Sequence, residues 1–374
     1  MIRSIAVVGT GLIGTSVALA ACRRGVTVYL SDRDATAART ASALGAGLAD
    51  EPPGPVDLAV IAVPPSKVGA VLAEVQRRAL ARAYTDVGSV KTVPERAALN
   101  AAPQPARYVG GHPLAGRERS GPLAARGTLF EGRPWVLTPS RLTSPATLER
   151  GRGLAELCGA TPLVMASHAH DDAVALTSHV PHLLASLMAA RLRDDPEGVA
   201  LLAGQGLRDV TRIAGGDSRL WADIIETNAP ALAGVVRAVH ADLTRLVPAL
   251  EALAGHGAGD RAEGLRTVVD LLDRGIAGLG AIPGGARREP PGQTAALRAA
   301  VPGRPGELGR FLGAVAALGA DAGSASVDTA PAGGFTVRCR VHPSDACRIA
   351  AKLKADGWDV DADGGDAELT PAPR

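Results

Sequence analysis

The feature that most constrains the fold lies within the first 32 residues of this 374-residue chain. Residues 5–8 form an apolar run of strand length, and Gly9, Gly11 and Gly14 follow in the spacing G-x-G-x-x-G where a helical stretch begins. In such a unit the first glycine permits a tight turn, the second lets the backbone approach a phosphate, and the third lets the helix pack on the strand. The pattern predicts a dinucleotide-binding α/β domain of Rossmann type.

The second strand predicts which dinucleotide is bound. Val26 to Leu30 has the composition of a strand, and Asp32 follows it about twenty residues beyond the glycines, where a ribose-binding acid is expected. A carboxylate there accepts a hydrogen bond from the ribose 2′-hydroxyl and repels a 2′-phosphate, which favours NAD. Arg33 beside it keeps NADP as an alternative. The predicted cofactor residues are Gly9, Gly11, Leu12, Ile13, Gly14, Asp32, Val63 and Ser89.

Composition narrows the class of protein. The length predicts two or three domains, and 46% hydrophobic residues suffice to build their cores. A net charge of +2 without a basic stripe argues against nucleic-acid binding. We expect a cytoplasmic protein without a membrane partner, because the sequence shows no signal-peptide pattern and no apolar run of spanning length. The cysteines lack C-x-x-C spacing, which predicts reduced thiols; they are Cys22, Cys158, Cys339 and Cys347.

Two further strands place chemistry at one edge of the predicted parallel sheet. Residues 58–63 and 83–87 are apolar runs of strand length, and the second leads into Ser89. A third strand at 107–109 leads into His112. Because the carboxyl ends of parallel strands share one edge, Ser89 and His112 are expected to converge beside the nicotinamide. A histidine accepts a proton near neutral pH, so the pattern predicts a dehydrogenase that acts on a hydroxylated substrate.

The rest of the chain predicts two more domains. Apolar residues at spacings of three and four indicate helices at 171–192, 198–213, 220–253 and 262–279. After a linker-like stretch, the order β-α-β-β-α-β is that of a ferredoxin-like fold. The predicted segments are a Rossmann domain at 1–166, an all-helical domain at 167–282, a linker at 283–293, the ferredoxin-like domain at 294–362 and a tail at 363–374.

Five motifs lie along the chain: the glycine loop through Ser16, residues 86–91 (DVGSVK), 111–116 (GHPLAG) with Ser120-Gly121, 178–182 (SHVPH), and 206–213 (GLRDVTRI) with Trp221. Through these motifs, and over nearly its whole length, the chain resembles the prephenate and arogenate dehydrogenases of tyrosine biosynthesis. The third domain resembles an ACT domain, which implies an aromatic amino acid effector, tyrosine or phenylalanine. Its predicted effector residues are Gly303, Pro305, Gly306, Glu307 and Leu308.

The resemblance implies roles for particular residues in the NAD-dependent oxidative decarboxylation of prephenate. His112 is the base for the substrate hydroxyl, and Ser89 hydrogen-bonds His112. Arg212 is the carboxylate clamp, oriented by Asp209, with Arg208 as the alternative clamp. Ser178 and His182 line the substrate pocket from one helix face, whereas His179 points elsewhere and is structural. Pro181 is expected to kink this helix or to mark its first turn.

Several alternatives stay open from the residues themselves. Lys91 either approaches the cofactor or is a solvated strand-end lysine, and Trp221 is either a core residue or a ligand contact. No metal is expected, because the histidines lack metal-ligand spacing and the chemistry needs no Lewis acid. Residues 215–218 depart from the family pattern, which commonly has a Ser-x-x-Pro type run before the Trp, and this puts the geometry between Arg212 and Trp221 in doubt.

Other functions compete with the main hypothesis of a homodimeric prephenate dehydrogenase acting on a small-molecule substrate. The enzyme alternatives are an arogenate dehydrogenase and a dehydrogenase of amino-substituted prephenate in secondary metabolism. The alternative of another class is a non-catalytic sensor of cofactor and amino acid. The set of Ser89, His112 and Arg212 disfavours the sensor, because a sensor needs no base.

Overall fold

The computed structural model describes residues 2–116, 119–193, 198–255, 257–282, 295–320, 325–330, 333–341 and 343–363. Contacts divide the chain into two units, Met1–Val247 and Pro248–Arg374. The predicted linker at 283–293 and nearly all of the predicted tail lie outside the described residues.

A seven-stranded sheet organises the first unit, in the order β2-β1-β3-β4-β5-β6-β7. Its strands are β1 (Ser4–Val8), β2 (Thr27–Ser31), β3 (Leu58–Ile61), β4 (Tyr84–Asp86), β5 (Tyr108–Pro113), β6 (Pro134–Thr138) and β7 (Thr161–Val164). Neighbouring strands are parallel except β5 and β6, which are antiparallel. The prediction of a Rossmann-type α/β domain is confirmed, but the sequence did not indicate that β6 runs antiparallel to β5.

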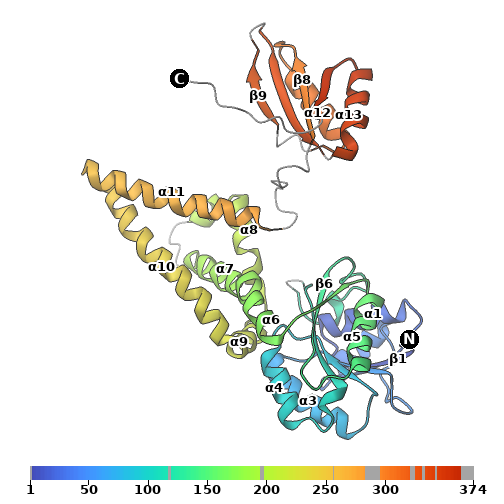
Figure 1. Ribbon diagram of the computed structural model, residues 1–374. Coiled ribbons are helices and arrows are strands. Elements are labelled where there is room, and N and C mark those ends of the chain that lie inside the picture. The colour runs from blue at the N-terminus through green and yellow to red at the C-terminus, as the bar shows by residue number, and fades with distance from the viewer. Residues whose placement is uncertain are drawn as a thin grey trace. The chain divides into compact units, whose positions relative to one another are not determined.

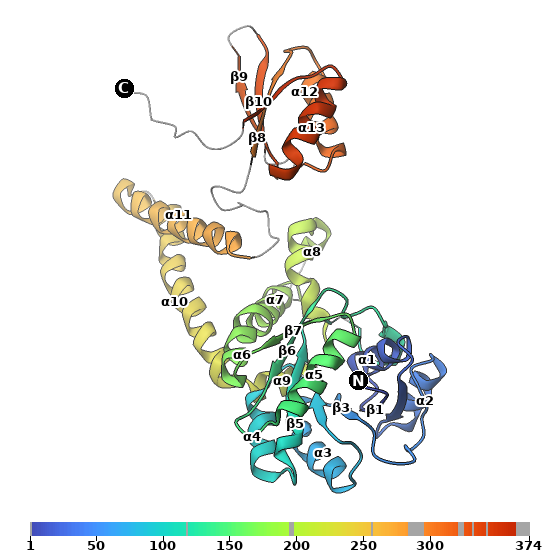
Figure 2. The same ribbon diagram turned by 45° about the vertical axis from the view of Figure 1, so that its right-hand side comes forward.

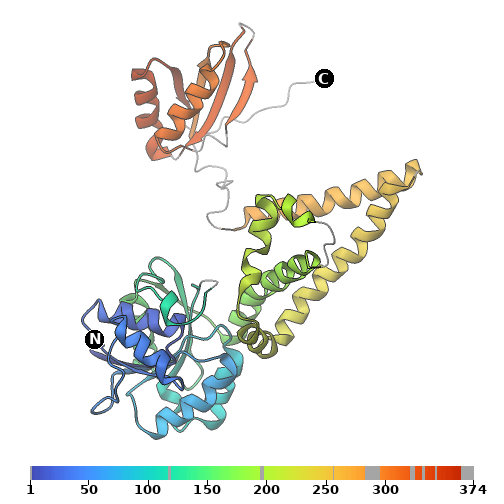
Figure 3. The same ribbon diagram turned by 180° about the vertical axis from the view of Figure 1, so that it is seen from behind.

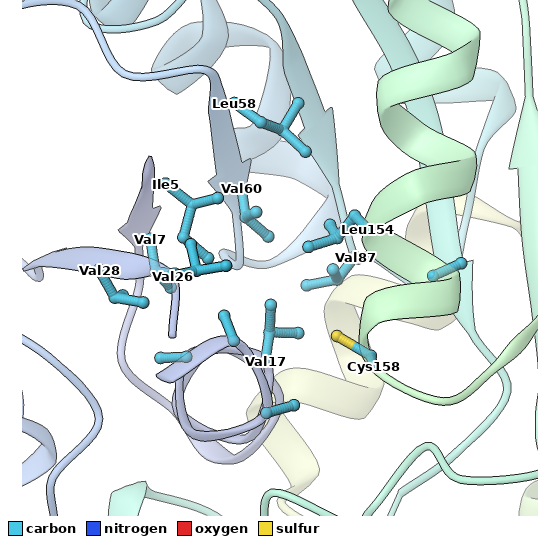
Figure 4. Close-up of a cluster of buried hydrophobic side chains, with 14 of the residues drawn as sticks. Ile5, Val7, Val17, Val26, Val28, Leu58, Val60, Val87, Leu154 and Cys158 are labelled. Atoms are coloured by element: carbon cyan, nitrogen blue, oxygen red, sulfur yellow. The ribbon is translucent and has the colours of Figure 1, made fainter. Parts of the chain in front are cut away.

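Helices cover both faces of this sheet (Figure 1). They are α1 (Leu12–Cys22), α2 (Ala35–Ala43), α3 (Pro65–Arg77), α4 (Thr92–Ala101) and α5 (Pro145–Leu157), with short 3-10 turns at Pro105–Arg107 and Pro122–Ala124. Alternate residues of the central strands point to opposite faces. Ile5 and Val60 lie between α1, which carries Val17, and α5, which carries Leu154, as Figure 4 shows, whereas Ile61 packs with Val68 of α3. The strands read as continuous apolar runs because both faces are buried.

The remainder of the first unit is helical. It comprises α6 (Ser167–Val174), the π-helical segment η3 (Ala175–His179), α7 (Val180–Arg191), η4 (Val199–Leu202), α8 (Gln205–Thr211), η5 (Arg212–Gly215), α9 (Ser218–Thr227) and α10 (Ala229–Ala254), which crosses the boundary between the units. Pro181 lies in the first turn of α7. The single helix predicted at 220–253 is two helices, α9 and α10, because the chain leaves helical geometry at Asn228. Figure 2 shows α6 leading into α7.

Together α6, η3 and α7 form one helix, Ser167–Arg191, that is long and apolar enough to cross a membrane by length and composition, with a mean hydropathy of 1.3 over an 18-residue window. The sequence shows no uninterrupted apolar run of this length because polar residues divide it. Those polar residues, His170, Asp171, His179 and His182, are buried among protein groups of the first unit. Ionisable groups are costly in hydrocarbon, so one such helix is weak evidence for a membrane span.

The second unit contains α11 (Ala258–Gly280) and a four-stranded antiparallel sheet in the order β11-β8-β10-β9. Its elements follow the chain as β8 (Ala295–Val301), α12 (Glu307–Ala317), β9 (Ser326–Thr329), β10 (Phe335–Val341), α13 (Pro343–Ala355) and β11 (Asp359–Asp363). Helices α12 and α13 lie on the same side of this sheet (Figure 3). Between them and the sheet is a core that includes Phe311, Leu353 and Trp358. All members of that core come from residues 295–360, so this β-α-β-β-α-β domain has a core of its own.

Candidate active site

The glycine loop between β1 and α1 has the features of a phosphate-binding turn. Gly9 has a φ of +102°, and a Cβ built on it would lie 2.2 Å from the Ala62 carbonyl oxygen. A Cβ on Gly14 would lie 2.0 Å from the Gly9 carbonyl oxygen. Protein packing therefore requires both glycines. A Cβ on Gly11 would meet nothing within 4 Å, so the space beside it is open for a pyrophosphate to approach.

The other predicted cofactor residues surround this loop. Leu12 and Ile13 begin α1, whose first turn carries no acidic residue and no side-chain cap, which leaves its N–H groups suited to an anion. Asp32 follows β2 and is held in place, because one carboxylate oxygen accepts a bond of 2.6 Å from the Thr10 N–H. Val63 is half-buried just beyond β3. The open side of Gly11, the bare helix start and the oriented carboxylate fit a dinucleotide.

A buried ion pair joins the ends of β4 and β5. The Lys91 ammonium pairs with Asp86, and both side chains are fully buried. The ammonium also donates to the Gly111 carbonyl at 2.7 Å, while the Tyr108 hydroxyl donates to Asp86 at 2.6 Å. Burial lowers the pKa of Lys91, and the Asp86 charge opposes that shift. The alternative of a solvated strand-end lysine is wrong, because the Lys91 ammonium is buried and binds the strand that carries His112. Its approach to a cofactor stays a prediction.

The structure places His112 and Ser89 at the same edge of the sheet but does not join them. The ring partner of His112 is His170, whose Nε2 lies 2.8 Å from the Nδ1 of His112, so the predicted Ser89 hydrogen bond to His112 is replaced. Burial is the main cause that holds the pKa of His112 well below its usual value, and neighbouring His170, Lys91 and His179 act in the same direction. The imidazole is therefore uncharged at neutral pH, as a base must be.

His170 belongs to α6, which packs against α4 (Figure 1). Its Nδ1 lies 2.8 Å from a carboxylate oxygen of Asp171. That carboxylate also accepts from the backbone N–H groups of Lys91 and Thr92, both at 2.8 Å, at the start of α4. The sequence predicted no catalytic role for His170 or Asp171. Their adjacency on one helix gave no signal of this role, because the partner lies 58 residues away.

The π-helical segment changes which side chains share a face. Regular α-helical spacing put Ser178 with His182 and turned His179 away. In the structure Ser178 is exposed, while His179 and His182 are both buried against Trp221, so the predicted arrangement of the three side chains on the helix is wrong. The role of Ser178 in the substrate pocket stays a prediction. His182 stacks on the Trp221 ring with centroids 3.6 Å apart, and His179 meets it edge-on. The extra residue in a π-turn rotates the residues beyond it about the helix axis, and the sequence carried no sign of such a turn.

His179 also has a fixed hydrogen-bond pattern. The Asn228 amide nitrogen donates to the Asp171 carbonyl at 2.9 Å, which fixes the orientation of the amide, and the same nitrogen contacts His179 Nδ1 at 3.1 Å. The Nδ1 atom therefore accepts. Burial lowers the pKa of His179 to about 4, so the ring is uncharged and its proton lies on Nε2. Within the described residues that Nε2 atom has no hydrogen-bond partner.

The predicted clamp lies beside this aromatic stack. Arg212 begins η5, which packs against α7, and a hydrogen bond with the Ile213 backbone opposes the burial that lowers the pKa of His182. Arg212 and Arg208 are both exposed. Asp209 accepts from Gln205 at 2.8 Å.

The unusual run at 215–218 has a local explanation. A Cβ on Gly216 would lie 2.4 Å from the Trp221 indole nitrogen, so the ring packs directly on the glycine. Asp217 caps α9 by accepting from the N–H groups of Arg219 and Leu220. This glycine lets Trp221 pack close to the chain, and Trp221 is a half-buried ring that stacks on a predicted pocket residue.

The predicted effector residues form a turn in the second unit. Gly306 has a φ of +88° and precedes α12, and a Cβ on Gly303 would lie 1.9 Å from the Gly333 carbonyl oxygen. Glu307 pairs with Arg310 at 2.7 Å, and Leu308 packs on the domain core. Pro305 lies in the same turn. In the described part of the chain, no group of three His, Cys, Asp or Glu residues could hold a metal ion.

Comparisons with known proteins agree with this geometry. The family model "Prephenate dehydrogenase, nucleotide-binding domain" matches residues 17–164, and "Prephenate dehydrogenase, dimerization domain" matches residues 166–265. "Probable prephenate dehydrogenase NovF" of Streptomyces niveus is 40% identical over 360 residues, which cover 95% of this chain and 99% of that protein.

Solved structures share the fold. Prephenate dehydrogenase from A. aeolicus, solved with hydroxyphenyl propionate and NAD+, matches with a TM-score of 0.63 and 24% identity over 74% of this chain and 98% of that one. Synechocystis arogenate dehydrogenase matches with a TM-score of 0.58 and 25% identity over 74% of this chain and 99% of that one. With its nucleotide-binding and dimerisation domains both matched, and a relative aligned along almost its entire length, the chain belongs to the prephenate dehydrogenase family.

Proposed function

We propose that the chain catalyses the NAD-dependent oxidative decarboxylation of prephenate to 4-hydroxyphenylpyruvate. The observation that carries the proposal is the position of His112 at the end of β5, at the same sheet edge as an open glycine loop. The glycine loop, the start of α1 and Asp32 would hold NAD, which supplies the hydride acceptor. The 40% identity with a probable prephenate dehydrogenase supports the same substrate class.

The proposed reaction assigns each chemical demand to a residue. His112 takes the proton of the C4 hydroxyl as the C4 hydride leaves and a carbonyl forms. The ring carboxylate then departs as CO2, and its bonding electrons enter the ring, which becomes an aromatic phenolate that takes a proton back. Arg212 binds a substrate carboxylate, and Ser178, His182 and Asp209 belong to the substrate site. Ser89 positions the substrate and the cofactor at the loop after β4.

The test measures NADH formation with prephenate and with arogenate, each with NAD and with NADP. We expect turnover with prephenate and NAD. Faster turnover with arogenate would support the second substrate, which the Synechocystis relative is named for. Absence of turnover with every pair would support a sensor.

Substitution of His112 by Asn tests the base directly. We expect kcat to fall by about 10²–10⁴ while NAD affinity stays the same, because the ring is removed but the glycine loop is not. NAD binding to the purified variant, followed by fluorescence, is the control for folding. Near-normal turnover would remove His112 from the mechanism.

We also propose that the protein is a homodimer formed through its helical part. On α11 exposed apolar residues repeat at spacings of three and four; they are Leu265, Val269, Leu272, Ile276 and Leu279. A stripe of this kind suits a second copy of the chain. The matched dimerisation domain supports the same assembly. Light scattering after gel filtration tests it, and a monomer at micromolar concentration would contradict it.

For the C-terminal domain, residues 294–362, we propose an ACT-type regulatory role with tyrosine or phenylalanine as effector. The turn from Gly303 to Leu308 leads into the start of α12, where free N–H groups can receive a carboxylate. We place the enzyme in the cytoplasm, which suits its four free thiols.

A further inference from the structure

A chain of buried hydrogen bonds links His112 to the first helix of the helical part. His112 Nδ1 contacts His170 Nε2, and His170 Nδ1 contacts Asp171, each at 2.8 Å. His170 is 1% exposed and Asp171 4%, so the contact between them is buried, and the contact of His170 with the half-buried His112 is partly buried. We propose that His170 and Asp171 are positioning residues that hold the His112 ring in the one tautomer able to accept the substrate proton. The proposal rests on His112 as the base.

The tautomer follows from the chemistry of the three groups. Burial raises the pKa of Asp171, but hydrogen bonds from His170, Thr92 and Lys91 outweigh burial and hold that pKa below its usual value, so the carboxylate is ionised and only accepts. His170 Nδ1 must therefore carry a proton. The two rings share one proton between His170 Nε2 and His112 Nδ1, and the proposal assigns it to His112, so that His112 Nδ1 donates and His170 Nε2 accepts. The Nε2 atom of His112 is then left unprotonated, as a base requires.

The same series of hydrogen bonds stabilises the positive charge that forms on His112 during the reaction. His112 becomes an imidazolium when it takes the proton, and its environment opposes that charge through burial and through His170, Lys91 and His179. Of the nearby carboxylates, Asp86 is already paired with the Lys91 ammonium. Asp171 is the carboxylate that reaches His112 through a hydrogen-bonded ring. Its negative charge stabilises the imidazolium and so lowers the barrier to proton transfer.

Asp171 also ties the base to its surroundings. Its carboxylate caps the N–H groups of Lys91 and Thr92, just beyond the loop that holds Ser89, and its carbonyl accepts from Asn228 at the end of α9. One residue thus connects the sheet edge, the start of α4 and the helices that carry the predicted substrate residues. A purely structural role for the pair is the competing explanation, and substitutions at positions 170 and 171 separate the two.

Substitution of His170 by each of two amide side chains distinguishes a positioning role from a purely structural one. The terminal atoms of Gln reach the place of histidine Nε2, so His170→Gln still offers an acceptor to His112. Asn reaches only the place of Nδ1, so His170→Asn keeps the contact with Asp171 but leaves His112 without its partner. We expect kcat to fall by about 10²–10⁴ in His170→Asn, the range for a base in the wrong tautomer, with KM little changed. We expect the kcat of His170→Gln to be at least about tenfold higher than that of His170→Asn.

Asp171→Asn tests the charge. We expect a lower kcat, and an acid limb of kcat/KM that moves to lower pH, because the imidazolium loses its carboxylate and the His112 pKa falls. His168→Gln and Asp172→Asn are matched controls, since both residues are exposed on the same helix, and both should match wild type. NAD binding and thermal melting show that each variant is folded.

The outcomes decide between the roles. If His170→Asn retains more activity than His170→Gln, the contact with Asp171 matters only for structure and the proposal is overturned. It is also overturned if both match wild type. Loss of activity in His112→Asn, together with unaffected position-170 variants, would reject the positioning pair and leave the base intact. If the variants fail to fold, the imidazole ¹⁵N chemical shifts of the wild-type enzyme test the proposal instead, measured at a pH above the acid limb of its activity. We expect His112 to be protonated on Nδ1. Protonation on Nε2 would refute the proposal.

Discussion

At the scale of single residues, the environment of His112 decides which protonation state the enzyme uses. Burial and neighbouring groups hold its pKa well below the usual value, so an uncharged ring is present across the neutral range. A base with so low a pKa is a weaker proton acceptor in isolation. The Asp171 charge, carried through His170, offsets that weakness at the moment of transfer.

The low pKa of His112 predicts a pH profile with a definite sign. Only the uncharged ring accepts a proton, so activity is lost as the pH falls through that pKa and is present above it. We expect kcat/KM to be flat through neutral pH and to decline only well below pH 6.5, the usual histidine value. Steady-state rates from acid to neutral pH, with enzyme stability checked at each point, measure it. An acid limb centred at or above neutral pH would contradict the assignment.

Arg212 and Arg208 provide a matched pair, because both are exposed arginines one helical turn apart. We expect Arg212→Ala to raise KM for prephenate by the equivalent of roughly 1.5–3 kcal/mol, typical of a hydrogen bond to a charged group, and Arg208→Ala to do less. Arg212 adjoins Ile213, whose backbone contacts His182. Initial-rate kinetics of both variants measure the two KM values. A larger increase in KM for Arg208→Ala than for Arg212→Ala would identify Arg208 as the clamp.

At the scale of elements, the glycine loop shows how one short motif serves both packing and binding. Gly9 and Gly14 are required by backbone contacts between β1, β3 and α1, whereas Gly11 faces open space. The sequence motif alone does not show which glycines are required for packing and which for binding. The distances from a Cβ built on each glycine distinguish the two roles.

Gly11→Ala is expected to weaken NAD binding, whereas Gly14→Ala is expected to lower the stability of the fold. The added methyl at position 14 would meet the Gly9 carbonyl oxygen, so we expect destabilisation of about 1–3 kcal/mol, as for overpacking. The methyl at position 11 has room, so we expect unchanged stability but NAD binding weaker by about tenfold or more, because it occupies the approach of the pyrophosphate. Thermal melting and NAD titration of both variants measure this. A stable Gly14→Ala with normal NAD binding would refute the packing argument.

Local patterns predicted the elements whose causes are local. The strands and helices of the first 100 residues follow from apolar periodicity and the glycine loop, and Asp32 lies beside that loop as expected. The π-turn at Ala175–His179 was missed because it depends on packing rather than on residue type. The partnership of His112 with His170 was missed because it joins different elements. Lys91 was misjudged because its charge is matched by Asp86, which only the folded chain reveals.

At the scale of the whole molecule, the first unit alone contains every residue proposed to touch NAD or prephenate. The β-α-β-β-α-β domain has its own core, and the exposed Arg310 lies over the ring of the core residue Trp358 in a cation–π contact. An independent core with no reacting group is typical of a domain that regulates or assembles. The domain should therefore be separable from catalysis.

Removal of the C-terminal domain is expected to leave catalysis intact and to abolish control by amino acids. A chain ended at Ile282 keeps all helices of the first unit and α11, so we expect prephenate turnover near the full-length rate. In the full-length enzyme, tyrosine or phenylalanine should shift substrate affinity by a coupling of about 1–3 kcal/mol, and substrate should shift effector affinity equally. Calorimetry with each aromatic amino acid, on full-length and shortened protein, measures the binding. Equal heats from both proteins would place the effector elsewhere, and no heat from either, with unchanged kinetics, would leave the domain a purely structural part.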